Sequence, residues 1–276
     1  MTRVLVFDSG VGGLSVADAI AAAGLDLQLD YVADNAWLPY GEKPAAALRA
    51  RIPALLAAAR AELEPDLIVL ACNTASTIAL DAVRAAIDLP IVGVVPPIKP
   101  AAAITKTGVI GLLATPVTVQ TPYVDDLIAQ FAAHVRVVRC GASALVAAAE
   151  AKLAGEPVAP AAIAAVIAPL FAGPDGEKID VAALACTHFP LLRDELAAAA
   201  PHAVAWLDSG EAIARRVASL LSAGLGAVRP RRAAFTAPEG ARRLHDAFAL
   251  RGFTSFARIG PAPGFTLAPL AVSGAG

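Results

Sequence analysis

The apolar positions of this chain gather in short strand-like runs, and longer alanine-rich stretches separate them. The runs of strand length cover residues 3–8, 28–33, 67–71, 91–95, 108–113, 135–139, 181–185 and 203–207. Continuous apolar runs of this length are typical of strands that are buried on both faces. Strands that alternate with helical stretches predict an α/β protein with mainly parallel sheets flanked by helices.

A proline cluster divides this pattern into two similar halves. Three prolines fall within residues 96–100, and because proline can continue neither a helix nor a central strand, we expect a linker there. After the linker the pattern starts again, and a new strand leads to Thr115 much as the first strand leads to Asp8 and Ser9. The sequence therefore predicts two similar domains, with the active site in the cleft between them.

The last part of the chain is predicted to return to the first domain. A helix is expected to begin near Asp208, with Ser209 as its N-cap and Glu211 in its first turn. Strand patterns follow at residues 231–236 and 254–259, outside the second half, whereas the Pro-, Gly- and Ala-rich residues 261–276 are expected to be frayed. The predicted first domain is residues 1–97 plus 208–276, and the predicted second domain is residues 98–207.

Composition and charge bear on the kind of partner. Hydrophobic residues make up 57% of the chain, so the uncharged stretch at residues 157–174 raises the question of a membrane span. That stretch contains Pro160 and Pro169 and consists largely of alanine, which favours a packed helix. A formal net charge of −2 without a basic run argues against nucleic acid and against a membrane surface. We expect a small-molecule partner.

The cellular compartment is predicted from the N-terminus and the cysteines. The first apolar run is cut short by Asp8 and is typical of a strand, not of a signal peptide. The cysteines are Cys72, Cys140 and Cys186, an odd number that argues against a disulfide framework. Reduced thiols are typical of a cytoplasmic protein.

Two of these cysteines occupy matched settings. Residues 70–74 are Leu-Ala-Cys-Asn-Thr and residues 184–188 are Leu-Ala-Cys-Thr-His, each directly after an apolar run. Both sulfur atoms are therefore expected at the carboxyl end of a parallel strand, where open α/β sheets bind ligands. A thiol ionises close enough to neutral pH to act as a base in one form and as an acid in the other. One thiol from each half predicts chemistry from two opposite sides. The alternative is that these cysteines are small buried hydrophobic residues without a chemical role, which is what we expect of Cys140.

Two further loops at predicted strand ends carry candidate residues. The glycine-rich residues 8–15 can turn backbone amides towards a ligand, although their spacing is not that of a dinucleotide fingerprint. A tight strand-to-helix turn capped by Asp8 is the alternative. Pro39 and Gly41 predict a second turn, which exposes two amides and the phenol of Tyr40 to one space. An ordered surface loop with an aromatic plug is the alternative there.

Four motifs, taken in order, resemble those of glutamate racemases, the cofactor-independent enzymes that make D-glutamate for peptidoglycan. The motifs are residues 8–14, 39–41, 71–75 and 184–191, and the resemblance covers nearly the whole chain. Residues 92–100 and 150–153 are similar to that family as well. The carboxylate that the family carries in its second domain falls on Glu150.

The chemistry that the resemblance implies is the inversion of the α-carbon of glutamate by two thiols. One cysteine, as a thiolate, removes the α-proton, while the other, as a thiol, delivers a proton to the opposite face. By family analogy Cys72 acts on the D-isomer and Cys186 on the L-isomer. Asp8 would relay a proton for Cys72, and His188, with Glu150 behind it, would do so for Cys186.

The resemblance also implies a set of substrate-binding residues that use hydroxyl, amide and backbone groups. They are Ser9, Pro39, Tyr40, Gly41, Asn73, Thr74, Thr115, Thr118 and Thr187. Val117 departs from the family pattern, which favours glycine there. The family's role implies a cytoplasmic enzyme that serves peptidoglycan synthesis, cell-wall biogenesis and cell shape, and it allows a homodimer.

Several alternatives stay open at this point. Aspartate and hydantoin racemases belong to the same two-cysteine superfamily, and a catalytically silent protein could keep the cleft to bind an amino acid. A zinc site of Cys72, Cys186 and His188 lacks the usual ligand spacing. A two-thiol redox protein would need a Cys-x-x-Cys motif, and a pyridoxal enzyme would need a lysine at a strand end facing the cleft. We therefore expect neither a metal nor a cofactor.

Overall fold

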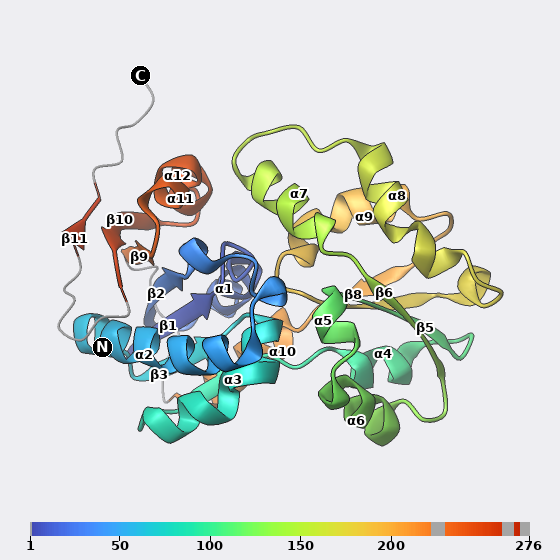
Figure 1. Cartoon of the computed structure of the whole chain (residues 1–276), viewed down its shortest axis with the longest axis horizontal. Coiled ribbons are helices and arrows are strands. Elements are labelled where there is room, and N and C mark those ends of the chain that lie inside the picture. The colour runs from blue at the N-terminus through green and yellow to red at the C-terminus, as the bar shows by residue number, and fades with distance from the viewer. Residues whose placement is uncertain (1, 222–229, 261–267, 271–276) are drawn as a thin grey trace. The chain divides into compact units, whose positions relative to one another are not determined.

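The computed structural model describes residues 2–221, 230–260 and 268–270 of the chain. The chain divides into two compact units (Figure 1). Unit 1 consists of Met1–Val94 and Gly210–Gly276, and unit 2 consists of Val95–Ser209. The chain passes from one unit to the other within three residues of the predicted boundaries at 97/98 and 207/208.

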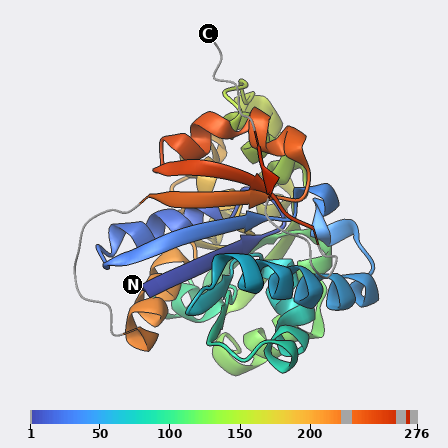
Figure 2. The same cartoon turned by 90° about the vertical axis from the view of Figure 1, so that its left-hand side faces the viewer.

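Unit 1 contains a seven-stranded sheet with the strand order β11-β10-β9-β2-β1-β3-β4 (Figure 2). Its strands are β1 (Thr2–Asp8), β2 (Leu27–Ala33), β3 (Leu67–Leu70), β4 (Ile91–Gly93), β9 (Arg231–Phe235), β10 (Phe253–Arg258) and β11 (Ala268–Pro269). All neighbouring strands are parallel except β10 and β11. β1 lies between β2 and β3, so the carboxyl ends of these three strands meet at one edge of the sheet.

Helices cover the sheet of unit 1. They are α1 (Leu14–Ala22), α2 (Ala45–Leu63), α3 (Asn73–Ala86), α10 (Gly210–Leu220), α11 (Pro238–Arg243) and α12 (His245–Ala249), with the short 3-10 helices η1 (Asn35–Trp37) and η2 (Tyr40–Glu42). One core cluster joins Leu5 and Phe7 of β1 to Leu48 and Ile52 of α2. α3 packs beside α2, and α1 packs against α10. The alternation of side chains along β1 directs Leu5 and Phe7 to the face that α2 and α3 cover.

Unit 2 contains a four-stranded parallel sheet with the order β6-β5-β7-β8. Its strands are β5 (Val109–Ala114), β6 (Arg136–Gly141), β7 (Val181–Ala185) and β8 (Ala205–Leu207). Its helices are α4 (Ile98–Ile104), α5 (Pro116–Val119), α6 (Pro122–Phe131), α7 (Ala144–Leu153), α8 (Pro160–Phe171) and α9 (Arg193–Ala199), with η3 (Gly176–Lys178) and η4 (Phe189–Leu192). The fold is therefore α/β, with parallel sheets flanked by helices as predicted.

The apolar stretch that raised the membrane question forms α8, which packs against α9. Among the residues that the structure describes, no helix is both long enough and apolar enough to cross a membrane. α10 begins directly after Ser209, whose hydroxyl donates to the backbone oxygen of Val95 at 2.6 Å, and Glu211 lies in its first turn.

The prediction of a frayed C-terminus is wrong for its middle part. Ala268 and Pro269 form β11, which pairs with Arg258 and Ala257 of β10. The backbone of the neighbouring Leu270 also donates to the backbone oxygen of Phe256 at 2.9 Å. These hydrogen bonds order a segment whose composition alone predicted disorder. The rest of that predicted tail, residues 261–267 and 271–276, lies outside the described residues.

Candidate active site

Cys72 occupies the predicted position at the carboxyl end of a strand in unit 1. It follows β3 by two residues and is the N-cap residue of the 14-residue helix α3, with an extended backbone (φ −67°, ψ 124°). Its Sγ lies 3.7 Å from the Oγ of Ser9, within reach of a hydrogen bond to sulfur. The side chain is only 6% exposed. The unpaired N–H groups at the start of a helix favour negative charge, so this position suits a thiolate.

Asp8 and Ser9 reach the same edge because β1 and β3 are adjacent strands. The backbone of Ala71 donates to the oxygen of Phe7 at 2.8 Å, which joins the two strand ends just before Cys72. Asp8 is fully buried, and its Oδ2 accepts the backbone N–H of Gly10 at 3.0 Å. Asp8 therefore does cap the strand-to-helix turn. Asp8 also directly precedes Ser9, whose hydroxyl contacts the thiol of Cys72.

Gly13 is required in this turn by close packing. A Cβ added at Gly13 would lie 2.7 Å from the Oη of Tyr31 and 2.9 Å from the Cβ of Asp8. Both distances are shorter than real Cβ contacts, so any other residue would displace the turn. The same hydroxyl of Tyr31 donates to the oxygen of Gly10 at 2.9 Å, which fixes the turn against β2.

The turn of Pro39, Tyr40 and Gly41 differs from the prediction in one respect. The phenol of Tyr40 is not exposed to a ligand space: the residue is 1% exposed, and its hydroxyl donates to Oδ2 of Asp34 at 2.6 Å. Burial raises the pKa of Tyr40 far above its ordinary value, and the charge of Asp34 raises it further, so the phenol stays protonated. The side chain of Tyr40 is thus bonded inside the protein, so Tyr40 can bind a ligand only through its backbone. The peptide bond between Leu38 and Pro39 is cis.

Asn73 begins α3 directly after the thiol and carries a buried acceptor. It is 5% exposed, and its Oδ1 has no hydrogen-bond partner among the described residues. Thr74, the next residue, is 4% exposed. A buried carbonyl oxygen without a donor is costly, and the cost is removed when a ligand supplies an N–H group.

Cys186 occupies the matching position in unit 2, directly after β7, and is 8% exposed. Its Sγ lies 4.0 Å from Nδ1 of His188, and Nε2 of the same ring lies 2.9 Å from Oε1 of Glu150. His188 and Glu150 are both buried. A carboxylate can only accept, so Nε2 donates to it and Nδ1 faces the sulfur. The three side chains form a sulfur–imidazole–carboxylate chain, in the order that the family resemblance implies.

The predicted threonines of unit 2 lie at two neighbouring strand ends. Thr187 follows Cys186 and is 5% exposed, while Thr115 follows β5, which pairs with β7 through Ala114 and Ala185. The hydroxyls of Thr115 and Thr118 are 2.9 Å apart. Thr118 is 1% exposed, so we assign it a place behind Thr115 and not beside a ligand.

Lys152 is a residue whose role at this site the sequence did not reveal. It lies two residues after Glu150 on α7, and its Nζ donates to the backbone oxygen of Leu191 at 2.9 Å and pairs with Glu195 at 2.8 Å. These contacts join α7 to η4 and α9, the elements that follow His188. Glu150 and Lys152 thus hold one helix against the segment that carries the imidazole. The run Glu-Ala-Lys in the sequence was the only signal.

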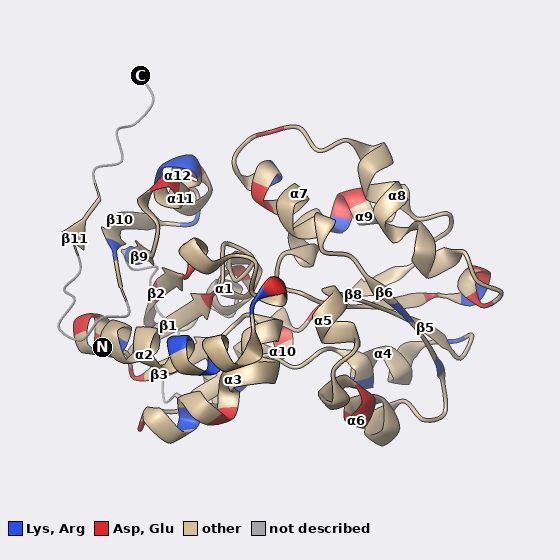
Figure 3. Cartoon of the chain, in the orientation of Figure 1, with Lys and Arg blue, Asp and Glu red and all other residues tan. Residues whose placement is uncertain are grey.

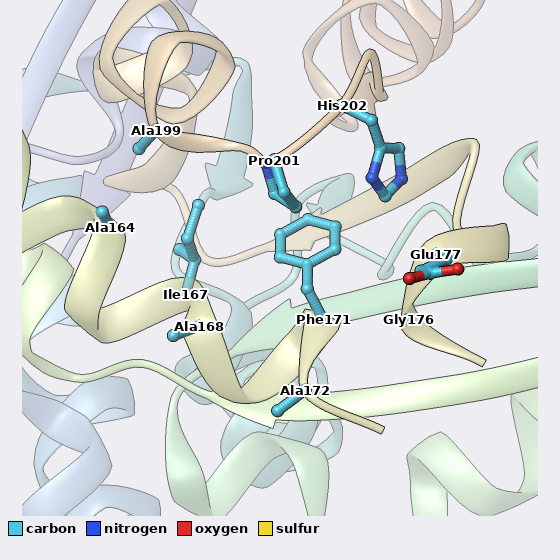
Figure 4. A pocket seen from close by; sticks show the side chains of 10 residues that line it. All are labelled: Ala164, Ile167, Ala168, Phe171, Ala172, Gly176, Glu177, Ala199, Pro201 and His202. Atoms are coloured by element: carbon cyan, nitrogen blue, oxygen red, sulfur yellow. The ribbon is translucent and has the colours of Figure 1, made fainter. Parts of the chain in front are cut away.

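The cavity in unit 2 shown in Figure 4 is separate from these residues. It has a volume of about 800 Å³ and is lined by α8, the 3-10 helix η3, the end of α9 and the segment that follows α9, including Ile167, Phe171, Pro201 and His202. None of the predicted site residues lines it. The ring of His202 contacts the edge of Phe171, and its Nε2 donates to the oxygen of Ile179, so the imidazole already has a structural partner.

Acidic and basic side chains are intermixed in both units (Figure 3). Within residues 2–221, 230–260 and 268–270, no group of three or more His, Cys, Asp or Glu residues is arranged to hold a metal ion. The three cysteines, all of them described, form no disulfide.

Comparison with known proteins places this chain in a family. The profile of the family described as Asp/Glu/Hydantoin racemase matches residues 14–217. A curated glutamate racemase of Sphingopyxis alaskensis is 56% identical over 217 residues, which are 79% of this chain and 81% of that protein.

Two solved structures extend the comparison to the fold. The structure of Escherichia coli glutamate racemase, in complex with L-glutamate and the activator UDP-MurNAc-Ala, is 41% identical and has a TM-score of 0.88. It covers 96% of this chain and 98% of its own. Glutamate racemase from Thermus thermophilus, in complex with beta-chloro-D-alanine, is 28% identical with a TM-score of 0.73, covering 94% of this chain and 96% of its own. The chain therefore belongs to the Asp/Glu/Hydantoin racemase family and, within it, to the glutamate racemases.

Proposed function

We propose that this protein is an isomerase that interconverts L-glutamate and D-glutamate by proton transfer between two thiols. The observation that carries the proposal is the matched pair of Cys72 and Cys186, each at the carboxyl end of a parallel strand and each beside its own polar groups. The identity to curated glutamate racemases along most of the chain supports glutamate over aspartate or a hydantoin as the substrate.

The proposed reaction moves one proton off the α-carbon and another onto it. From L-glutamate, the thiolate of Cys186 takes the α-proton, and the electron pair of the broken C–H bond stays on the α-carbon. The thiol of Cys72 then gives its proton to the opposite face, so that a new C–H bond forms and Cys72 becomes the thiolate. The mechanism requires that both sulfur atoms reach one α-carbon. From D-glutamate the two roles are reversed.

A second turnover in the same direction requires the two thiols to exchange their protonation states with solvent. On the Cys186 side, His188 accepts the proton at Nδ1, and Glu150 holds the ring in the tautomer that leaves Nδ1 available. On the Cys72 side, the hydroxyl of Ser9 touches the sulfur, and the carboxylate of Asp8 lies next along the chain. We assign Asp8 and His188 as the proton relays.

The substrate is proposed to bind polar groups that follow the strands of both units. Asn73 supplies a buried acceptor that suits the α-ammonium group. The backbone N–H groups of Tyr40 and Gly41 and the hydroxyls of Thr74 and Thr187 suit carboxylate oxygens. Ser9, Pro39 and Thr115 complete the proposed set, and Thr118 orients Thr115 from behind.

The wider role follows from the reaction. D-Glutamate is a component of peptidoglycan, so we propose that the enzyme serves cell-wall synthesis and cell shape. We also propose a cytoplasmic location, where reduced thiols persist, and units 1 and 2 as the two domains of the enzyme. A homodimer remains part of the proposal.

The test is exchange of the α-proton in deuterated water. Purified protein, dialysed with a chelator, is given L-glutamate or D-glutamate, and the α-deuterium content and the optical rotation are followed together. We expect both enantiomers to acquire deuterium as they invert, and aspartate to turn over at least about 100-fold more slowly. Deuterium entry without inversion, or a preference for aspartate, would overturn the proposal. Binding of glutamate without exchange would identify a catalytically silent binding protein.

A further inference from the structure

A buried carboxylate close to the Pro39–Gly41 turn accepts four side-chain hydrogen bonds. Asp34 follows β2 and is fully buried. It accepts from the hydroxyl of Tyr40 at 2.6 Å, from Nε and Nη2 of Arg51 at 2.6 and 2.7 Å, and from the hydroxyl of Thr236 at 2.8 Å. The group joins three segments of unit 1: the loop after β2, the helix α2 and the end of β9.

The ion pair holds the turn on both of its sides. The guanidinium of Arg51 lies 4.5 Å from the centre of the Trp37 ring, before the turn, and Asp34 binds the phenol of Tyr40, within it. Burial opposes the charge on Arg51, but the hydrogen bond and the charge of Asp34 outweigh it and raise the pKa of the guanidinium. The guanidinium contacts both carboxylate oxygens, and this fork geometry is directional in a way that a single hydrogen bond is not.

The backbone around Asp34 is bonded to the strand ends that carry the candidate site. The backbone N–H of Asp34 donates to the backbone oxygen of Asp8 at 2.9 Å. On the other side, Asn35 donates to the oxygen of Ala237 at 2.8 Å and accepts its N–H at 2.9 Å. The loop from Asp34 to Gly41 is thus fixed to both β1 and β9. Nothing in the proton-transfer mechanism uses this carboxylate, although it lies at the same sheet edge as Asp8.

We propose that Asp34, Arg51 and the phenol of Tyr40 are positioning residues that set the Pro39–Gly41 turn for binding a carboxylate of the substrate. The inference rests on the proposed function, in which the backbone N–H groups of Tyr40 and Gly41 bind glutamate. Two N–H groups bind a carboxylate well only when both point at it, so the orientation of the turn controls affinity. These three side chains act through the turn and touch no reacting atom.

The chain offers a matched control on the same strand. Asp30, in the middle of β2, is 1% exposed and binds Arg232 of β9 through Nε at 2.9 Å and Nη2 at 2.5 Å. This second pair has the same chemistry and a similar burial of the carboxylate. It lies four residues earlier on the strand, away from the carboxyl end. A change in the Asp30–Arg232 pair is therefore expected to lower stability without altering the orientation of the Pro39–Gly41 turn.

The experiment compares Tyr40→Phe, Arg51→Lys and Arg232→Lys with the natural protein. The phenylalanine keeps the ring and leaves Asp34 with three other donor contacts, and the lysines keep the charge but lose the fork. We expect Tyr40→Phe and Arg51→Lys to raise the KM for glutamate about tenfold with kcat within about twofold, because the turn is correctly placed in only a fraction of molecules. Arg232→Lys should lower the melting temperature but leave KM unchanged.

The outcomes separate the inference from the proposed function. If the natural protein racemises glutamate and both turn variants keep its KM while losing only melting temperature, the inference is wrong and the proposed function stands. A fall in kcat with unchanged KM would also overturn the inference, because it would indicate a part in the chemical step. If the natural protein does not racemise glutamate at all, the proposed function falls and the inference falls with it.

Discussion

The two units place a thiol at the same point of a parallel sheet but surround it with different groups. Cys72 has a hydroxyl at 3.7 Å and the start of a long helix, whereas Cys186 has an imidazole at 4.0 Å that is backed by a carboxylate. The topology of the sheet fixes where each sulfur lies, and the neighbouring side chains decide how a proton reaches it. The symmetry of the fold therefore does not extend to the proposed proton relays, and the two thiols should respond differently to mutation.

The largest expected effect is that of removing either sulfur. Cys72→Ala and Cys186→Ala should each lower racemisation at least about 1,000-fold, because one proton-transfer group is lost from one face. The remaining thiol can still remove and return the α-proton on its own face. We therefore expect Cys72→Ala to exchange deuterium into L-glutamate only and Cys186→Ala into D-glutamate only, without inversion, as measured by NMR.

Cys140 is the control for this experiment. Its sulfur is 4% exposed and donates to the backbone oxygen of Val166 at 3.8 Å, and burial raises its pKa, so it stays a neutral thiol. Cys140→Ala should racemise glutamate within about twofold of the natural rate, because the side chain only packs. Comparable losses in all three alanine variants would indicate that the sulfurs matter only for the core, and the two-thiol mechanism would be wrong.

The next largest effect tests the relay in unit 2. His188→Asn should lower kcat/KM about 100-fold, since a positioned acid–base group contributes about that much. The enantiomers have equal free energies in water, so kcat/KM must fall equally in both directions. The asymmetry should be seen instead in the primary isotope effect, which we expect to grow for 2-deuterio-L-glutamate, whose proton Cys186 removes, and to stay nearly constant for 2-deuterio-D-glutamate.

Removal of the hydroxyl that contacts the Cys72 sulfur in unit 1 is expected to have a milder effect. Ser9→Ala removes a neutral hydroxyl beside Cys72, and the start of α3 still favours negative charge there. We expect kcat/KM to fall about tenfold or less, with the larger isotope effect now on 2-deuterio-D-glutamate. The measurement is the same pair of isotope effects. An equal effect of both mutations on both isotopomers would mean that the relays are not separate.

The fold was largely predictable because buried parallel strands carry a strong local signal. Each predicted strand-like run lies where a strand forms, with ends that differ by a few residues. β8 is shorter than its run, since only Ala205–Leu207 pair with β7. β11 was missed because a two-residue strand has no periodicity to detect, and only its pairing with β10 defines it.

The candidate site was predictable where its residues belong to a motif at a strand end, and not where folding adds residues that no motif carries. Cys186 and His188 are two residues apart and follow one strand, so a motif identified both. Asp34 and Thr236 are 202 residues apart, and no local pattern connects them. The phenol of Tyr40 was predicted to be exposed because the residues Pro39 and Gly41 indicate a turn but do not indicate that Asp34 binds the phenol inside the protein.

The smallest effect compares two aspartates that precede the thiol-bearing strands, Asp66 before β3 and Asp180 before β7. Asp66 accepts one backbone N–H, that of Arg3, at 2.8 Å. Asp180 accepts the hydroxyl of Thr105 at 2.6 Å, the N–H of Lys106 at 2.7 Å and the hydroxyl of Thr107 at 3.1 Å. Burial raises the pKa of Asp180, but these hydrogen bonds outweigh it and lower the pKa below its ordinary value.

A lowered pKa means that the charged form stabilises the folded state. The stabilisation is complete above the ordinary pKa of 3.8 and is lost as the pH falls through the lower folded value. At pH 7 we expect Asp180→Asn to lower the free energy of unfolding by about 1 kcal/mol and Asp66→Asn to lower it by about half as much. The difference is expected because Asp180 accepts charge-assisted hydrogen bonds from three donors and is less exposed than Asp66. Urea unfolding at pH 7 and pH 3 measures both. The deficit of Asp180→Asn should shrink at pH 3, and a deficit that is the same at both pH values would show that its hydrogen bonds do not depend on the charge.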